Sequence, residues 1–282
     1  MQVSEIKNIF HLELDGLYAK EEVDSFFFLF LEKYINIDRF GLVMQPNLVL
    51  TKEEENPFFT GLSELKKERP IQYIIGETTF MDSLLKVNEN VLIPRPETEE
   101  LVQWLIDDVG ATSELKILDI GTGSGCIAVS LAKNLPNSKV YALDVSKEAI
   151  HLAKENAVLN GVEINFINAD ILTSSLDLDL SFDIIISNPP YVREIEKEEI
   201  HNNVKNYEPS LALFVSDANP LIFYEAIAEF SKKHLSKDGK LYIEINQYLG
   251  EETKALFENK NFNKVILKKD IFDNHRMIRC EK

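Results

Sequence analysis

Residues 116–126 read KILDIGTGSGC, in which an apolar run passes directly into three closely spaced glycines. The run predicts a buried strand over residues 116–120, and Pro136 is expected to end a helix that begins at Cys126. Between them, Gly121, Gly123 and Gly125 form a turn without Cβ atoms, which lets a ligand approach the backbone closely. Ligands of open α/β sheets bind beyond the carboxyl ends of the strands, so this turn is a candidate binding site.

Apolar segments and helical patterns alternate after this turn. Strands are predicted at 139–145, 163–168, 182–187 and 240–245, and helices at 146–161 and about 220–235. A turn is expected at 237–239, and a helix and two strands are expected to close the chain. This alternation predicts an α/β fold built on a doubly wound parallel sheet.

The amino-terminal part of the chain has a different pattern. Phe26, Phe27, Phe30 and Leu31 recur at the spacing of an apolar helical face, so residues 1–75 are predicted to form a small helical domain. Alternating apolar and polar residues from about 71 to 93 indicate a β-hairpin, expected to link the domains over residues 76–95. Pro96, followed by acidic residues, indicates the helix start that opens an α/β domain over residues 96–282.

The spacing of the glycines favours one kind of ligand. A dinucleotide fingerprint, G-x-G-x-x-G, would place its third small residue at position 126, which is Cys126. The spacing present, G-x-G-x-G, is typical of S-adenosylmethionine sites. Asp144 lies at the end of the second predicted strand, where a carboxylate can accept both ribose hydroxyl hydrogens. Taken alone, the glycines also fit a tight turn that holds no ligand.

Two further acidic residues are candidates for this site. Asp119 lies just before the glycines and can face the methionine ammonium group, although a local role as a cap or loop ligand is the alternative. Asp170 follows the third predicted strand, where it can meet the adenine amino group.

The strand at 182–187 runs directly into Asn188-Pro189-Pro190-Tyr191. The prolines impose an extended exit, which exposes the Asn188 side-chain oxygen and the Pro189 carbonyl at the carboxyl edge of the sheet. Two acceptors can hold a planar NH2 group by its two hydrogens, and Tyr191 offers a flat face for a conjugated amide or base. The tetrad therefore predicts methyl transfer to nitrogen, catalysed mainly by positioning; a proline turn that only ends the strand is the alternative.

Composition restricts the partners and the compartment. A net charge of −17 opposes binding to a phosphate backbone. The five histidines have no ligand spacing, so no metal is expected, and Cys126 is expected to pack rather than act as a nucleophile. Two cysteines, no apolar stretch of membrane-spanning length and no secretory signal predict a cytoplasmic protein without a membrane partner.

The tetrad and the glycine turn together resemble those of amino-methyltransferases, which include adenine-N6 and glutamine-N5 enzymes. Three further segments are similar to the HemK/PrmC family of release-factor glutamine N5-methyltransferases: RPIQYIIGE at 69–77, LIPRPETE at 92–99, and YEP at 207–209 with LAL at 211–213. The resemblance covers about residues 65–282, whereas residues 193–206 match nothing closely and the ending at 274–277 matches loosely. The acidic run at 194–199 is expected to be a solvated flap or helix, with a substrate-facing role as the alternative.

The resemblance implies a Rossmann-like class I S-adenosylmethionine-dependent methyltransferase domain and an amino-terminal helical domain that docks the substrate. It implies methyl transfer to N5 of the glutamine in the Gly-Gly-Gln motif of class I peptide chain release factors, leaving S-adenosylhomocysteine. A monomer is expected. The implied catalytic and substrate-binding residues are Asn188, Pro189, Pro190 and Tyr191, with Arg95, Pro96 and Glu97 near the mouth of the site. The implied cofactor-binding residues are Asp119, Gly121, Thr122, Gly123, Ser124, Gly125, Asp144, Asp170, Ile171 and Asn188.

Two other functions compete with this one. A nucleic-acid adenine methyltransferase would share the tetrad, but it needs a phosphate-binding surface, and this acidic chain has few clusters of basic residues. Its charge instead suits a basic loop of a release factor, and no stable nucleic-acid binding is expected. A noncatalytic binding module could keep the fold, although Asn188 and Pro189 are intact.

Overall fold

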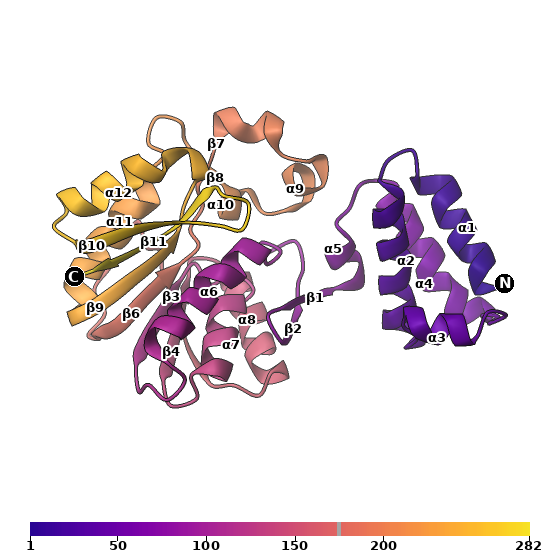
Figure 1. Cartoon of the computed structure of the whole chain (residues 1–282), viewed down its shortest axis with the longest axis horizontal. Helices are drawn as coiled ribbons and strands as arrows, with labels where there is room; N and C mark the ends of the chain where they lie inside the picture. The colour runs from indigo at the N-terminus through magenta and orange to yellow at the C-terminus, as the bar shows by residue number, and fades with distance from the viewer. Residues whose placement is uncertain (174–175) are drawn as a thin grey trace. The chain divides into compact units, whose positions relative to one another are not determined.

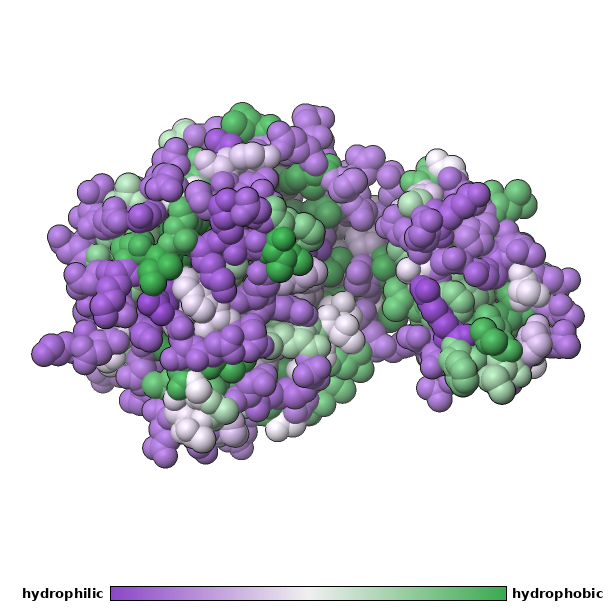
Figure 2. Space-filling view, in the orientation of Figure 1, coloured by the Kyte–Doolittle hydropathy of each residue, from purple (hydrophilic) through white to green (hydrophobic). Residues whose placement is uncertain are grey.

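The structure, a computed structural model, describes residues 1–173 and 176–282 in two compact units. The smaller unit contains Met1–Gly76 and Asn202–Tyr207, and the larger contains Glu77–His201 and Glu208–Lys282 (Figure 1). Hydrophilic residues cover most of the visible surface of each unit, as the high content of charged residues leads one to expect (Figure 2). None of the described helices is long and apolar enough to cross a membrane.

The smaller unit is helical, and its core is built from phenylalanines. Phe10, Phe27, Phe30 and Phe58 are fully buried and lie in ring contact with one another, several of them edge to face. α4 begins with the capping box that Thr51 and Glu54 form. The helices are α1 (Val3–Leu14), α2 (Lys20–Ile35), α3 (Arg39–Met44), α4 (Lys52–Leu65), α5 (Ile71–Ile75) and, from the later segment, α9 (Asn202–Tyr207).

The larger unit contains a seven-stranded sheet in the order β10-β11-β9-β6-β3-β4-β5. β11 runs antiparallel to both of its neighbours, and the other neighbouring strands pair in parallel. The predicted α/β class with a parallel sheet is therefore confirmed. The strands are β3 (Lys116–Ile120), β4 (Lys139–Asp144), β5 (Ile164–Asn168), β6 (Phe182–Ser187), β9 (Leu235–Glu244), β10 (Asn263–Lys269) and β11 (His275–Glu281).

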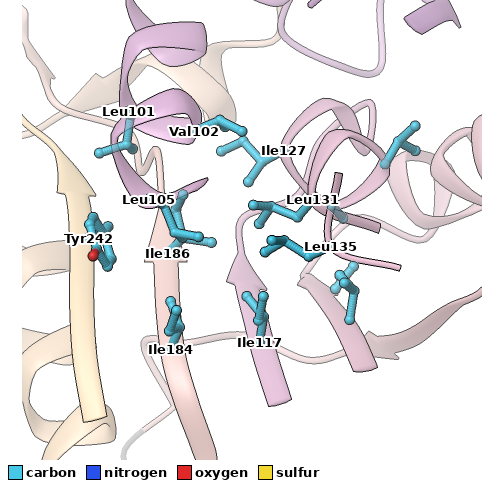
Figure 3. Close-up of a cluster of buried hydrophobic side chains, with 14 of the residues drawn as sticks. Leu101, Val102, Leu105, Ile117, Ile127, Leu131, Leu135, Ile184, Ile186 and Tyr242 are labelled. Carbon is cyan, nitrogen blue, oxygen red and sulfur yellow. The ribbon is translucent and has the colours of Figure 1, made fainter. Parts of the chain in front are cut away.

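Helices cover both faces of this sheet, so its central strands are apolar on both sides. Ile117 of β3 packs into the core beneath α6 and α7 (Figure 3), whereas its neighbour Leu118 joins the core on the opposite face with α11 and α12. The helices are α6 (Pro96–Val109), α7 (Cys126–Asn134), α8 (Lys147–Leu159), α11 (Ile222–His234) and α12 (Gly250–Asn259). Shorter elements are α10 (Ser210–Leu213), β7 (Val192–Arg193), β8 (Phe214–Val215) and the 3₁₀ turns η1 (Glu194–Glu199) and η2 (Gln247–Leu249).

The β-hairpin is shorter than its sequence pattern predicts and is not a separate linker. It consists of β1 (Glu77–Phe80) and β2 (Ser83–Lys86), while residues 71–75, expected as strand, form α5 after Pro70. Phe80 and Leu85 are buried in the core of the larger unit, and the Lys86 amide donates to Asn156 Oδ1 of α8 at 2.7 Å. The hairpin therefore belongs to the larger unit.

One local prediction on the carboxyl side is wrong. The turn expected at 237–239 is an irregularity inside β9: Leu235 pairs with Phe182 of β6, but the next pair joins Lys240 to Ile184. The acidic run at 194–199 forms the 3₁₀ turn η1, in agreement with the predicted solvated flap or helix, and most of its acids are exposed. Glu196 differs from them, because it is 7% exposed and accepts hydrogen bonds from the Arg193 amide and from Asn246 Nδ2.

Candidate active site

The glycine turn lies between β3 and α7, at the carboxyl edge of the sheet. The Gly121 and Thr122 amides donate to the Leu143 carbonyl of β4 at 2.8 and 3.0 Å, which holds the turn across the strand ends. Gly121 and Gly123 have φ values of 75° and 55°, a conformation that L side chains rarely adopt. A Cβ atom at Gly123 would meet no atom within 4 Å, so the backbone here borders open space.

Gly125 has a packing role, and its cofactor contact stays a prediction. It lies at the N-terminus of α7, and a Cβ atom built there would come within 3.0 Å of the Ala153 Cβ of α8. Gly125 does not line the cavity described below. The third glycine therefore allows two helices to approach closely.

Asp144 ends β4 beside the turn. Its Oδ2 accepts a hydrogen bond from the Gly123 amide at 2.8 Å, and its Oδ1 accepts one from the Ser146 amide at 2.9 Å. Burial raises the pKa of this carboxyl above its ordinary value, and the backbone hydrogen bonds oppose that shift. Each carboxylate oxygen keeps a second lone pair, so Asp144 can still accept hydroxyl hydrogens from a ligand.

Asp119 lies beneath the turn rather than beside the ligand space. It is completely buried, does not line the cavity, and accepts a hydrogen bond from Thr122 Oγ1 at 2.6 Å. Burial raises the pKa of its carboxyl to about 7, and the nearby Asp144 adds to the shift. This geometry favours the local alternative, in which Asp119 holds the turn, over the predicted contact with a methionine ammonium group.

We expect the replacement Asp119→Asn to stabilise the protein relative to the wild type more at pH 8 than at pH 5. The raised pKa means that ionisation of Asp119 weakens the folded state progressively as the pH rises from about 4 through about 7. Asparagine keeps an oxygen for Thr122 and does not ionise. Urea unfolding measures the free energy of unfolding of both proteins, and the difference between them should grow by about 1–3 kcal/mol from pH 5 to pH 8. An equal difference at both pH values would contradict the raised pKa of Asp119.

A cavity of about 330 Å³ lies over this edge of the sheet and is large enough for a small-molecule ligand. Many of the residues predicted for the site line it together, namely Arg95, Gly121, Thr122, Gly123, Ser124, Asp144, Asp170, Ile171, Asn188, Pro189 and Pro190. Asp119, Gly125, Glu97 and Tyr191 do not line it.

Cys126 also lines the cavity, as a free thiol. Burial raises the pKa of this thiol to about 12, so it stays neutral and is not an activated nucleophile. Among residues 1–173 and 176–282, no three His, Cys, Asp or Glu side chains group so as to hold a metal ion.

The Asn188-Pro189-Pro190-Tyr191 tetrad leaves β6 at the same edge. Asn188 Nδ2 donates to Thr98 Oγ1 at 2.9 Å, a bond that leaves the Asn188 Oδ1 atom available as an acceptor. The Tyr191 hydroxyl points away from the cavity and donates to Glu244 Oε1 at 2.9 Å. The free oxygen of Asn188 can therefore accept a hydrogen bond from a ligand.

Glu208 holds the segment that leads into α6, and the sequence pattern gave it no role of its own. Its Oε1 accepts a hydrogen bond from Arg95 Nη2 at 2.6 Å, and its Oε2 accepts one from the Ile93 amide at 3.1 Å. Glu208 is 5% exposed, whereas the Arg95 side chain is 30% exposed, so the carboxylate is screened from water more than the guanidinium is. Arg95 is thereby kept at the cavity wall, whereas the first turn of α6 directs Thr98 inward and leaves Glu97 outside the lining.

Thr98 and Glu244 were also missed as functional residues, although their sequence context carries a signal. Thr98, Leu101, Val102 and Leu105 have the spacing of one buried helical face. Glu244 is a single acid in the otherwise apolar end of β9, where a buried charge needs partners.

Comparison with known proteins agrees with this geometry. The family described as "Methyltransferase small domain" matches residues 98–206, and the family described as "PrmC N-terminal domain" matches residues 18–76. A "Release factor glutamine methyltransferase" of Flavobacterium psychrophilum is 52% identical over 99% of both chains. The chain belongs to the release factor glutamine methyltransferase family. A second member, from Bacteroides thetaiotaomicron, is 40% identical over 94% of this chain and 95% of its own.

Solved structures support the fold of this family member. A 16S rRNA methyltransferase of Thermus thermophilus, in complex with AdoMet and guanosine, gives a TM-score of 0.54 at 17% identity over 73% of this chain and 49% of its own. A methyltransferase of Pyrococcus furiosus gives a TM-score of 0.52 at 16% identity, over 82% of this chain and 99% of its own. The class I S-adenosylmethionine-dependent methyltransferase fold predicted from the sequence is confirmed.

Proposed function

We propose that this protein transfers a methyl group from S-adenosylmethionine to N5 of the glutamine in the Gly-Gly-Gln motif of class I peptide chain release factors. The observation that carries the proposal is the Asn188 oxygen, which is free to accept and lies in the wall of the cavity that the glycine turn also lines. The names of the full-length relatives supply the substrate class.

The residues of the cavity fit S-adenosylmethionine. Gly121 and Gly123 leave open space where side chains would intrude, and Asp144 offers acceptors for the ribose hydroxyls. Asp170 and Ile171 line the cavity wall, where the adenine would lie. When bound, S-adenosylmethionine supplies a methyl group attached to a positively charged sulfur. The sulfur is the leaving group, and its departure needs no metal or acid.

The tetrad would hold the acceptor. Asn188 Oδ1 and the Pro189 carbonyl would each accept one hydrogen of the glutamine NH2 group, which fixes the nitrogen and draws electron density toward it. The nitrogen would gain one methyl group as S-adenosylhomocysteine is released, and it would lose one proton to water. Because an amide nitrogen is a poor nucleophile, this orientation and polarisation would supply most of the rate acceleration. Tyr191 remains a predicted substrate contact, through its ring.

We further propose that the helical unit docks the release factor and that the protein acts as a cytoplasmic monomer. The match of residues 18–76 to the "PrmC N-terminal domain" and the net charge of −17, which suits a basic substrate loop, support the docking role. Light scattering at micromolar concentration tests the oligomeric state.

The function is tested by locating the transferred methyl group. The protein is incubated with methyl-labelled S-adenosylmethionine and either a class I release factor or duplex nucleic acid. We expect label on the glutamine of the Gly-Gly-Gln motif, identified by peptide mass spectrometry, and none on a release factor with alanine at that position. Label found only in nucleic acid would establish the competing adenine methyltransferase, and label in neither substrate would favour a binding module.

Asp144→Ala tests the ribose assignment. We expect the Kd for S-adenosylmethionine to rise about 10–100-fold, because hydrogen bonds to a charged acceptor and the support of the glycine turn are both lost. Isothermal titration calorimetry measures this Kd. Asp82→Ala, in the exposed hairpin turn outside the cavity, is the matched control and should bind as the wild type does. An unchanged Kd for Asp144→Ala would refute the assignment.

A further inference from the structure

A chain of hydrogen bonds runs from the tetrad into the interior of the larger unit. Asn188 Nδ2 donates to Thr98 Oγ1 at 2.9 Å, and Thr98 Oγ1 donates to Glu244 Oε2 at 2.7 Å. Thr98 is 2% exposed and Glu244 is 1% exposed, so water has little access to either side chain. Asn188 follows β6, Thr98 lies in the first turn of α6 and Glu244 ends β9, so the hydrogen bonds link three elements at the cavity wall, which Thr98 and Asn188 line.

The donors and acceptors of these hydrogen bonds can be arranged in only one order. A carboxylate only accepts, and both oxygens of Glu244 are used: Oε2 by Thr98, and Oε1 by the Tyr191 hydroxyl at 2.9 Å. The hydroxyl of Thr98 has a single hydrogen, which goes to Glu244. Its oxygen must then accept, and only the NH2 end of the Asn188 amide can donate to it.

This order decides what Asn188 presents to the cavity. With its NH2 group bound to Thr98, Asn188 keeps its oxygen as the end of the amide that can accept a hydrogen bond from an NH2 group in the cavity that Asn188 lines. A flipped amide would place its oxygen against the Thr98 lone pairs and its NH2 group against the substrate NH2 group, which loses both hydrogen bonds.

We propose that Thr98 and Glu244 are positioning residues that hold the Asn188 amide in the orientation required to accept from the substrate amide. The inference rests on the proposed function, because it concerns the acceptor of that reaction. Neither residue needs to touch the reacting atoms. Because the Glu244 carboxylate can only accept, Thr98 must donate to it, and the Thr98 oxygen must therefore accept from the NH2 group of Asn188.

Several groups face Glu244 and determine its charge. Arg276 of β11, itself bound through Nε to Asp270 Oδ2 at 3.0 Å, favours the carboxylate, as do the hydrogen bonds from Thr98 and Tyr191. Glu97 of α6 and burial oppose it, and burial is the largest influence, so the pKa of Glu244 lies above its ordinary value. The Tyr224 hydroxyl of α11 and the Cys126 thiol of α7 are also in electrostatic contact with Glu244, and both are neutral.

Protonation of Glu244 therefore weakens the chain of hydrogen bonds. A protonated carboxyl is neutral and carries a hydrogen on one oxygen, which makes that oxygen a donor and a poorer acceptor from Thr98 or from Tyr191. We expect kcat to fall on the acid side, at a pH higher than the titration of an ordinary glutamate would give.

Two replacements of Thr98 test the proposal. Thr98→Val keeps the shape of the side chain but removes its oxygen, whereas Thr98→Ser keeps the oxygen and loses only a methyl group. In release-factor methylation we expect Thr98→Val to lower kcat about 10–100-fold, with the Kd for S-adenosylmethionine within about twofold of the wild type. Thr98→Ser should keep at least about a third of the wild-type kcat. Wild-type turnover in Thr98→Val, or equal losses in both variants, would overturn the proposal.

Glu244→Gln gives a second, independent readout. Glutamine can keep its oxygen on Thr98 only if its NH2 group faces the Tyr191 hydroxyl, which then has to accept instead of donate. We therefore expect kcat to fall less than in Thr98→Val, and the acid limb of the pH profile to disappear because the titrating group is gone. An acid limb that persists unchanged would show that another group titrates and would refute the role of Glu244. If the wild type labels no release factor, the proposed function itself fails; if the wild type is active and Thr98→Val matches it, only this inference fails.

Discussion

Replacement of Asn188 by alanine is expected to lower kcat for methylation of a release factor about 10²–10³-fold, or ~3–4 kcal/mol in the activation free energy. The variant removes the oxygen that we propose accepts from the substrate amide, and it leaves the other residues of the cavity lining unchanged. Single-turnover methylation with saturating S-adenosylmethionine measures the effect on the chemical step directly.

The controls separate loss of the acceptor from loss of structure. Asn165→Ala, in β5 and outside the cavity lining, removes an asparagine of the same sheet and should leave turnover unchanged. The Kd of Asn188→Ala for S-adenosylmethionine should change much less than its rate does. If the Asn188→Ala enzyme turned over at the wild-type rate, the tetrad would not hold the acceptor and the proposed mechanism would be wrong.

The parts of the site that follow directly from local sequence were predictable. The glycine turn and Asp144 each lie at the end of a strand that an apolar run marks, and parallel strands bring their carboxyl ends to one edge. The helix start at Pro96 was equally visible, because proline and acids suit the first turn.

The alternation of side chains along β3 explains why Asp119 is buried and does not line the cavity. Side chains alternate along a strand, so Asp119 shares a face with Ile117, which packs beneath α6 and α7. Being near the glycines in sequence did not direct it into the cavity. The same alternation puts Glu244 on the face of Tyr242, toward α6, where it meets Thr98.

Other features depend on contacts between segments that are far apart in the sequence, and no local sequence pattern predicts such contacts. Arg95 and Glu208 pair across 113 positions of the sequence. Residues 202–207 join the smaller unit, where the Tyr207 hydroxyl donates to the Lys67 carbonyl at 2.8 Å. The hairpin likewise became part of the larger core because Phe80 and Leu85 had apolar partners there.

Phe27→Ala is expected to destabilise the smaller unit by about 3–5 kcal/mol, because it opens a cavity in a core made largely of aromatic rings. Phe27 is fully buried, and its ring centroid lies 5.7 Å from that of Phe10 and 5.9 Å from that of Phe58. Leu29→Ala, in the same helix but 40% exposed, is the matched control and should cost less than about 1 kcal/mol.

The single tryptophan makes it possible to assign the loss to one unit. Trp104 packs against the core of the larger unit, so its fluorescence reports unfolding there, whereas far-UV circular dichroism reports helices of both units. In a urea titration, Phe27→Ala should shift part of the dichroism transition to lower urea and leave the Trp104 midpoint and the Kd for S-adenosylmethionine unchanged. Equal shifts of both signals would mean that the two cores unfold as one cooperative unit. If only the dichroism transition shifts, there is a range of urea concentrations in which the smaller unit of Phe27→Ala is unfolded and the larger unit still binds S-adenosylmethionine. Loss of release-factor methylation in that range would show that the smaller unit is needed to bind the protein substrate.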